Sequence, residues 1–227
     1  ALSSAIGFGA LHYIALQYTT AINGALFQGL MSICILIAAL VILGDRFGGR
    51  ESVGVVLGFG GVAFIVTRGD VDVLLGLTFN IGDIILLAAT MSYSVYAVFL
   101  RRAPKELSSS ALMAGMFGFA TLYMLPLMLI ELYVFDRTFT VNTTAIWSIG
   151  FMTFGPSVLA QIFWAYSVSK VGPGRAGYFI YLAPVFGVIL AVSLLGEQFR
   201  WFHAAGIALI FSGIWLATRP KTGVSKT

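Results

Sequence analysis

Long apolar stretches alternate with short polar segments along the whole chain. Eight of these stretches approach the ~20 residues that an α-helix needs to cross a bilayer. None of them shows the alternation with period two that a membrane barrel strand requires. Because backbone groups inside lipid must find hydrogen-bond partners within the segment, the pattern predicts eight transmembrane helices in an all-α, polytopic membrane protein. The predicted helices are 3–17, 22–43, 53–67, 81–100, 111–133, 146–166, 177–195 and 203–218.

Composition supports a lipid environment. Of the 227 residues, 59% are hydrophobic and 10% are charged, whereas a soluble domain carries about a quarter charged residues. The formal net charge of +4 comes from basic residues scattered between apolar runs, which excludes a nucleic-acid-binding face. The sequence shows no catalytic triad, nucleotide-binding loop, metal cluster or paired cysteines. We therefore expect no catalytic residues, no metal and no cofactor, and a buried thiol at the single cysteine, Cys34.

Basic residues fall mainly on one side of the predicted membrane. Eight crossings return the chain to the side of its N-terminus. That side carries 10 of the 13 Lys and Arg residues, and the other side carries 3. The positive-inside rule makes the richer side cytoplasmic. We therefore expect residues 219–227 to form a cytoplasmic C-terminal tail.

The sequence Leu-Gly-Asp at 43–45 returns as Leu-Gly-Glu at 195–197, and the similarity extends into the following helix. Because three glycines and an acid match in one register, we interpret the pattern as an internal repeat. Equivalent helices lie five crossings apart, and since five is odd, the two copies are inverted. Inverted repeats are typical of secondary transporters. The identities are Leu43/Leu195, Gly44/Gly196, Phe47/Phe199, Gly54/Gly206, Leu57/Leu209, Phe59/Phe211 and Gly61/Gly213.

Two segments resemble the ends of the two repeats of EamA-type transporters, in the drug/metabolite transporter superfamily. They are ALQYTTAINGALFQGLMSICILIAALVILGDRFGGRESVGVVLGFGGVAFIV and AYSVSKVGPGRAGYFIYLAPVFGVILAVSLLGEQFRWFHAAGIALIFSGIWLA. The resemblance implies ten helices, five per repeat. Residues 1–70 would then be the last three helices of an incomplete first repeat, and 81–218 a complete second repeat. A further helix pair would precede Ala1 in an N-terminally truncated chain.

The resemblance also implies a function. It points to a secondary transporter, not an enzyme, that moves small metabolites or amphipathic organic compounds by alternating access. Export is favoured over uptake, and the bacterial inner membrane is the expected location. The expected partners are a small-molecule substrate and the lipid bilayer, with a homodimer left open.

Two other classes of protein stay open at this point. A non-transporting membrane scaffold or receptor would have a solidly packed interior. An intramembrane lipid-modifying enzyme would need His, Asp or Glu clustered near one membrane face.

Polar and aromatic side chains within the predicted helices are candidates for a substrate cavity, because amphipathic solutes suit aromatic faces with a few hydrogen-bonding groups. His12, near the middle of the first helix, is either a functional group or a neutral histidine bonded between helices. Trp164, Tyr166 and Tyr178 also fit the ordinary enrichment of aromatic residues at bilayer interfaces. The selected candidates are His12, Gln28, Tyr93, Gln161 and Tyr181.

Other notable residues favour structural roles. Asp45 and Glu197 follow helix-ending glycines and precede the next helix, and Asn80 with Asp83 matches a helix N-cap. Glycines at 54, 58 and 61 predict close helix packing. Gly155, Pro156 and Pro184 interrupt predicted helices and are the candidate hinges.

Overall fold

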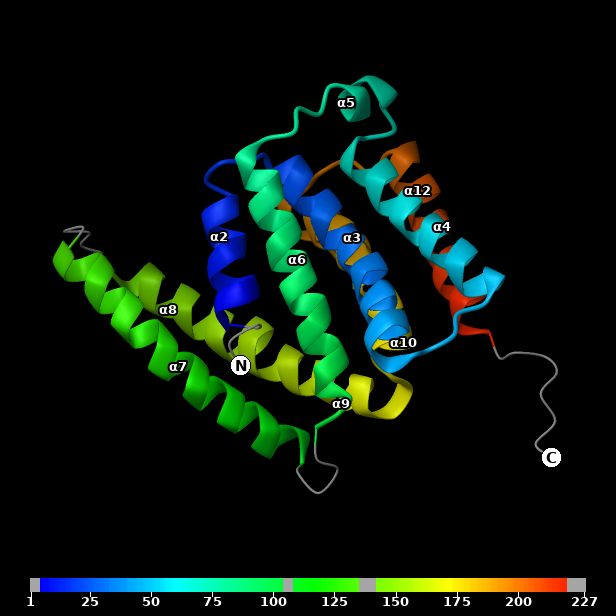
Figure 1. Cartoon of the computed structure of the whole chain (residues 1–227). Coiled ribbons are helices and arrows are strands. Elements are labelled where there is room, and N and C mark those ends of the chain that lie inside the picture. The colour runs from blue at the N-terminus through cyan, green and yellow to red at the C-terminus, as the bar shows by residue number, and fades with distance from the viewer. Residues whose placement is uncertain (1–4, 104–107, 135–141, 220–227) are drawn as a thin grey trace, which may run out of the picture.

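The computed structural model describes residues 5–103, 108–134 and 142–219, which form helices joined by short turns, with no strand among them (Figure 1). Seven helical segments in these ranges are long and apolar enough to cross a membrane. The protein is an all-α polytopic membrane protein, as the hydropathy pattern predicts. The segments are α3 (Ala21–Ala38) with η2 (Ala39–Leu43); α4 (Gly49–Val66); α6 (Ile81–Leu100); α7 (Ser109–Val134); α8 (Thr143–Met152) with η3 (Thr153–Leu159) and α9 (Ala160–Val171); α10 (Pro173–Tyr178) with η4 (Phe179–Tyr181) and α11 (Leu182–Leu195); and α12 (Trp201–Thr218).

The predicted first helix, 3–17, is shorter in the structure. Its described residues form the π-helical segment η1 (Ala5–Ala10) and the short helix α2 (Leu11–Ala15). Together they fall well below the ~20 residues of a full span, so an eighth crossing is not confirmed. Another short helix, α5 (Val71–Leu75), lies in the loop between α4 and α6. Residues 220–227 of the predicted tail lie outside the described ranges.

Short polar side chains begin several of the helices. Asn80 Oδ1 accepts a hydrogen bond from the Asp83 N–H at 3.2 Å, and Asp83 Oδ2 accepts one from the Asn80 N–H at 2.9 Å. This reciprocal pair satisfies two backbone donors that the first turn leaves without partners. Thr20 and Asn142 cap α3 and α8 through their side-chain oxygens. The N-cap predicted at Asn80 is confirmed.

The two Leu-Gly-acid sequences end their helices in the same way. Gly44 and Gly196 both have φ of +70°, in the left-handed region that glycine adopts without a Cβ clash. The next N–H then turns back onto the helix. Asp45 N–H donates to Ala39 O at 3.3 Å, and Glu197 N–H donates to Ala191 O at 3.2 Å. The two copies of the sequence pattern therefore give two copies of one local structure.

Helices α4 and α12 lie side by side and pack through glycines (Figure 1). A Cβ on Gly54 would lie 2.5 Å from Gly213 O, and one on Gly206 would lie 2.8 Å from Gly61 O. Because residue order reverses between these contacts, the helices are antiparallel. Gly54 matches Gly206 and Gly61 matches Gly213 in the sequence repeat, so one contact occurs twice, once from each side.

The reciprocal contacts fix where the two Leu-Gly-acid turns lie in the bundle. Each turn leads directly into α4 or α12, and the antiparallel pairing puts the starts of these helices at opposite ends of the bundle. An inverted repeat requires this arrangement. The repeat boundaries 1–70 and 81–218 stay a prediction.

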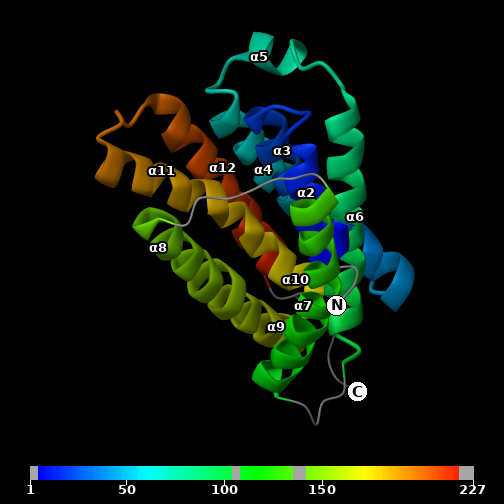
Figure 2. The same cartoon turned by 90° about the vertical axis from the view of Figure 1, so that its left-hand side faces the viewer.

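The remaining spans surround two main buried clusters. One joins α3, α6 and α9 around Tyr93, and the other joins α4, α11 and α12 around Val62 and Ile210. Helix α9 packs against α10 and against α7 (Figure 2).

Helical geometry changes at or beside Pro156 and Pro184. Gly155 and Pro156 lie within η3, where the chain is π-helical. Pro184 lies in the first turn of α11, just after the 3₁₀ segment η4. A proline lacks the N–H that an α-helix needs, so irregular turns at these places are expected. A hinge role for Gly155, Pro156 and Pro184 stays a prediction.

Candidate functional site

A group of aromatic and amide side chains gathers around Tyr93, near the middle of α6. The Tyr93 side chain is buried. Its ring centre lies 4.9 Å from that of Phe8, 5.4 Å from that of Tyr96 and 6.0 Å from that of Trp164. These distances are typical of favourable tilted and edge-to-face contacts. Tyr93 therefore stands where η1, α6 and α9 meet.

Gln161 brings hydrogen-bonding capacity to this group. Its side chain lies near the Tyr93 hydroxyl. The buried Gln161 Oε1 and the buried Trp164 Nε1 have no hydrogen-bond partner among the described residues. A buried polar atom without a partner costs about 1–3 kcal/mol. The group therefore holds one acceptor and one donor whose hydrogen bonds the described residues leave unmade.

His12 approaches the same group through Phe8. The two ring centres lie 5.1 Å apart, and His12 is partly buried. The structure thus brings together three of the predicted cavity residues, His12, Tyr93 and Gln161. We call Phe8, His12, Tyr93, Gln161 and Trp164 the aromatic–amide cluster.

The structure places the other two cavity candidates elsewhere. Gln28 is exposed and lines a separate pocket of about 160 Å³ with Gly29, Val62 and Pro184. Tyr181 is buried against Gly58, where a Cβ would lie 2.5 Å from the ring. Its hydroxyl has no hydrogen-bond partner of good geometry among the described residues, although Ser32 is nearby. Neither residue joins the aromatic–amide cluster.

Sequence reasoning undervalued Trp164. The sequence left it open whether this aromatic residue lines a cavity or lies at the bilayer interface, and in the structure its ring packs on Tyr93. Gln161 and Trp164 are three residues apart, so they lie on one face of α9. That spacing could have identified the pair.

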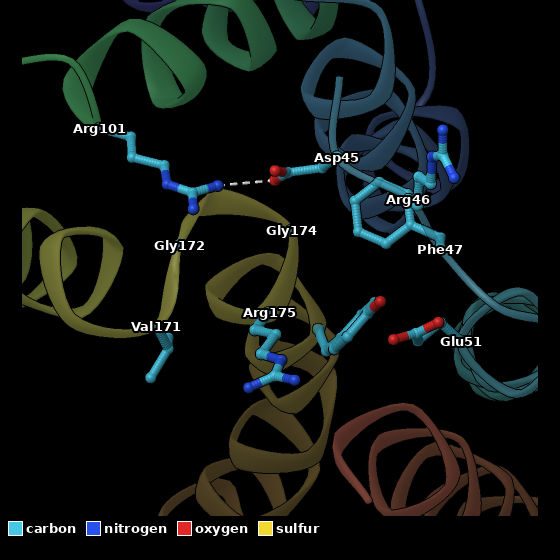
Figure 3. Close-up of a pocket in the computed structure, with 10 residues that line it drawn as sticks. Asp45, Arg46, Phe47, Glu51, Arg101, Val171, Gly172, Gly174 and Arg175 are labelled. Carbon is cyan, nitrogen blue, oxygen red and sulfur yellow. Dashed lines mark hydrogen bonds and ion pairs between the residues drawn. The ribbon is translucent and has the colours of Figure 1, made fainter. Parts of the chain in front are cut away.

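Two polar connections between helices were also missed. Asp83 is buried and accepts hydrogen bonds from Thr19 Oγ1 at 2.6 Å and Asn23 Nδ2 at 2.9 Å. These bonds tie the turn between α2 and α3 to the start of α6. At the opposite end of α6, Arg101 forms an ion pair with Asp45 at 2.7 Å (Figure 3). The sequence predicted only the helix-end roles of the two acids.

The Arg101–Asp45 ion pair borders a charged pocket of about 260 Å³. This pocket lies where the α3–α4 turn, the end of α6 and the α9–α10 junction meet (Figure 3). Within the described ranges, no group of three His, Cys, Asp or Glu residues is placed to hold a metal ion.

Comparison with known proteins assigns the sequence to a family. The sequence profile of the EamA-like transporter family matches residues 1–67 and 80–219. The chain belongs to the EamA-like transporter family. The profile leaves out the α5 loop. Because the profile covers most of the chain, family membership does not depend on any single motif.

Relatives of this EamA chain carry transporter names. It is 27% identical over 216 residues to the uncharacterized transporter YyaM of Bacillus subtilis, covering 93% of this chain and 69% of that protein. It is 27% identical over 218 residues to an uncharacterized transporter of Archaeoglobus fulgidus, covering 96% and 74%. A match over 141 residues, 25% identical, joins it to a Salmonella typhimurium protein named "Probable amino-acid metabolite efflux pump", covering 60% and 47%.

A solved crystal structure has the same fold. Its TM-score is 0.79 at 20% sequence identity, and the match covers 96% of this chain and 75% of the other. At this identity the likeness shows the fold alone.

Proposed function

We propose that this EamA transporter moves small, amphipathic organic metabolites by alternating access and binds them at the aromatic–amide cluster. The observation that carries the proposal is the pair of unsatisfied buried atoms, Gln161 Oε1 and Trp164 Nε1. A substrate with one donor and one acceptor would satisfy both. The surrounding rings suit the apolar part of such a molecule.

Selectivity would come mainly from the two polar atoms. A substrate that pairs both recovers the cost of leaving them unpaired, which is about 1–3 kcal/mol for each atom. A wholly apolar molecule recovers nothing and leaves the atoms buried. Tyr93 would hold the Trp164 indole in place through their ring contact.

The paired glycine helices support the alternating-access part of the proposal. Helices α4 and α12 meet through reciprocal contacts, so two inverted halves could rock about that contact without losing it. Export is the proposed direction. It is supported by the printed name of the Salmonella relative and by the family resemblance.

The proposed orientation follows from charge. The end that holds the Arg101–Asp45 pair also carries Lys170 and Arg175. By the positive-inside rule this end faces the cytoplasm. We place the C-terminus on the same side, in a bacterial inner membrane.

A membrane scaffold is the main competing function. It would have no need for unsatisfied polar atoms in its interior, since each lowers stability. The orphaned atoms of Gln161 and Trp164 therefore favour a ligand-binding role.

Transport by the complete protein tests the proposal. Cells would be screened for resistance to amino acids and their toxic analogues, and efflux of the best compound would then be measured in vesicles. Gln161→Leu should reduce efflux at least tenfold with unchanged membrane levels, because it removes the buried acceptor. Gln198→Leu, at the exposed α11–α12 turn, is the matched control. Equal efflux by the two variants would reject the site, and no efflux of any compound by the wild type would reject the function.

A further inference from the structure

An apolar groove lies along the α9–α10 junction, and basic side chains stand at one end of it. The groove has a volume of about 440 Å³, and its walls include Phe163, Phe179 and Ile180. Phe163 and Phe179 are exposed, with 66% and 52% of their surfaces accessible. Since this segment crosses the membrane, the groove opens toward lipid.

The groove adjoins the charged pocket. Val171 lines both. Lys170 lines the groove beside Val171, and Arg175 lines the charged pocket on the other side. In Figure 3, the Arg175 side chain points away from the Asp45–Arg101 pair. An apolar channel and a charged pocket thus meet at one residue.

Neither basic side chain at this meeting point forms an ion pair within the described part of the chain, although the Asp45 and Glu51 carboxylates line the charged pocket with Arg175. Lys170 lies over the Tyr166 ring, with its Nζ 5.5 Å from the ring centre, and Arg175 lines the charged pocket together with Tyr178 and Glu51. No ion pair joins either one to an acid there. Two cations are therefore available to a phosphate at the membrane surface.

A buried hydroxyl gives an independent sign of a ligand. Tyr178 lines the charged pocket, only 1% of its surface is exposed, and its hydroxyl has no hydrogen-bond partner among the described residues. It lies one helical turn after Arg175, on the same face of α10. A polar headgroup in the pocket would supply the missing partner.

We propose that the α9–α10 junction binds an anionic phospholipid of the phosphatidylglycerol type. Its phosphate lies between Lys170 and Arg175, and one acyl chain fills the groove along Phe163 and Phe179. A headgroup hydroxyl meets the Tyr178 hydroxyl in the charged pocket. Lipid binding here does not rest on the proposed transport function, because it needs no substrate and no conformational change, although Trp164 lines the groove and also belongs to the aromatic–amide cluster.

Fluorescence of Trp164 tests the proposal, because this side chain lines the groove. The complete protein, with its other tryptophans changed to Phe, is reconstituted in mixtures of brominated and ordinary lipids. Bromine quenches an indole that it touches. Each basic residue should raise the affinity for an anionic lipid about fivefold. With two such residues, the groove should prefer brominated phosphatidylglycerol over brominated phosphatidylcholine by roughly 25-fold.

Variants distinguish lipid binding at this site from a general attraction of anionic lipids to the basic end of the protein. The double variant K170Q/R175Q should lower the preference to nearly one. Arg50→Gln removes a charge at the same end of the bundle, outside the groove and the charged pocket, and should leave the preference unchanged. Tyr178→Phe should lower it about threefold, the effect of one ordinary hydrogen bond. A variant that keeps only Trp147, which is exposed on α8, should show no preference.

Four results would overturn the proposal. Equal quenching by both lipids, or an Arg50→Gln effect as large as that of the double variant, means that no specific site exists. Absence of quenching by either lipid means that another protein segment fills the groove. Loss of the preference in millimolar inorganic phosphate, at matched ionic strength, means that the site binds a free anion.

Discussion

Replacing Gly213 by Ala should destabilise the protein, because the new methyl group meets backbone atoms of α4. Its Cβ would lie 2.5 Å from Gly54 O and 2.7 Å from Gly58 N. A flexible side chain could rotate away, but these atoms belong to the neighbouring helix backbone. The two helices must therefore move apart by roughly 1 Å and lose their closest contacts. Overpacking of this kind costs about 1–3 kcal/mol.

Gly60→Ala is the matched control on α4. No heavy atom lies within 4 Å of a Cβ built there. Alanine at a helix interior is favoured over glycine by about 0.5–1 kcal/mol, so Gly60→Ala should be neutral or stabilising. Because the contact is reciprocal, Gly61→Ala should cost about as much as Gly213→Ala.

Cys34 provides the assay. It is the single cysteine of the chain and is buried, so it reacts with a maleimide only when the protein opens. The reaction rate is followed across an SDS titration in mild detergent, which yields the unfolding free energy of each variant. If Gly213→Ala is as stable as Gly60→Ala, the proposed α4–α12 contact is wrong.

Two further changes test other parts of the structure. Asp83→Asn should lower the unfolding free energy by about 2 kcal/mol in the Cys34 assay, because it weakens charged hydrogen bonds from Thr19 and Asn23. Its control, Asp72→Asn on the exposed helix α5, should have no measurable effect on that free energy. Equal unfolding free energies for the two variants would contradict the buried network. Arg101→Gln should change the unfolding free energy by less than about 1 kcal/mol, because the Arg101–Asp45 side chains are 44% and 30% exposed and solvent screens such pairs; a loss well above that would show that the pair is shielded from water.

Local chemistry made the helix ends predictable. The reciprocal bonds of Asn80 and Asp83, and the left-handed glycines at 44 and 196, depend only on residues close in the sequence. The glycine repeat likewise indicated close packing before the partner helix was known. Such features can be predicted from a single short segment of the sequence.

The composition of the site was less predictable, because it depends on how each helix is rotated. In a membrane protein both the lipid-facing and the buried surfaces are apolar, so hydropathy does not say which side chains face inward. Gln28 and Tyr181 looked equivalent to Tyr93 in sequence, yet Gln28 is exposed and Tyr181 packs on Gly58. Trp164 also fitted the enrichment of aromatic residues at bilayer interfaces, yet its ring packs on Tyr93 inside the protein.

The central claim is that two related helix pairs are inverted across the membrane, and side-specific labelling tests it most directly. Single cysteines would replace Asp45 or Glu197 in a Cys34→Ala background of the complete protein. An impermeant maleimide is then applied to intact cells and to inverted membrane vesicles. The account predicts that Glu197→Cys reacts in cells and Asp45→Cys reacts in inverted vesicles. Reaction of both cysteines from the same side would contradict it.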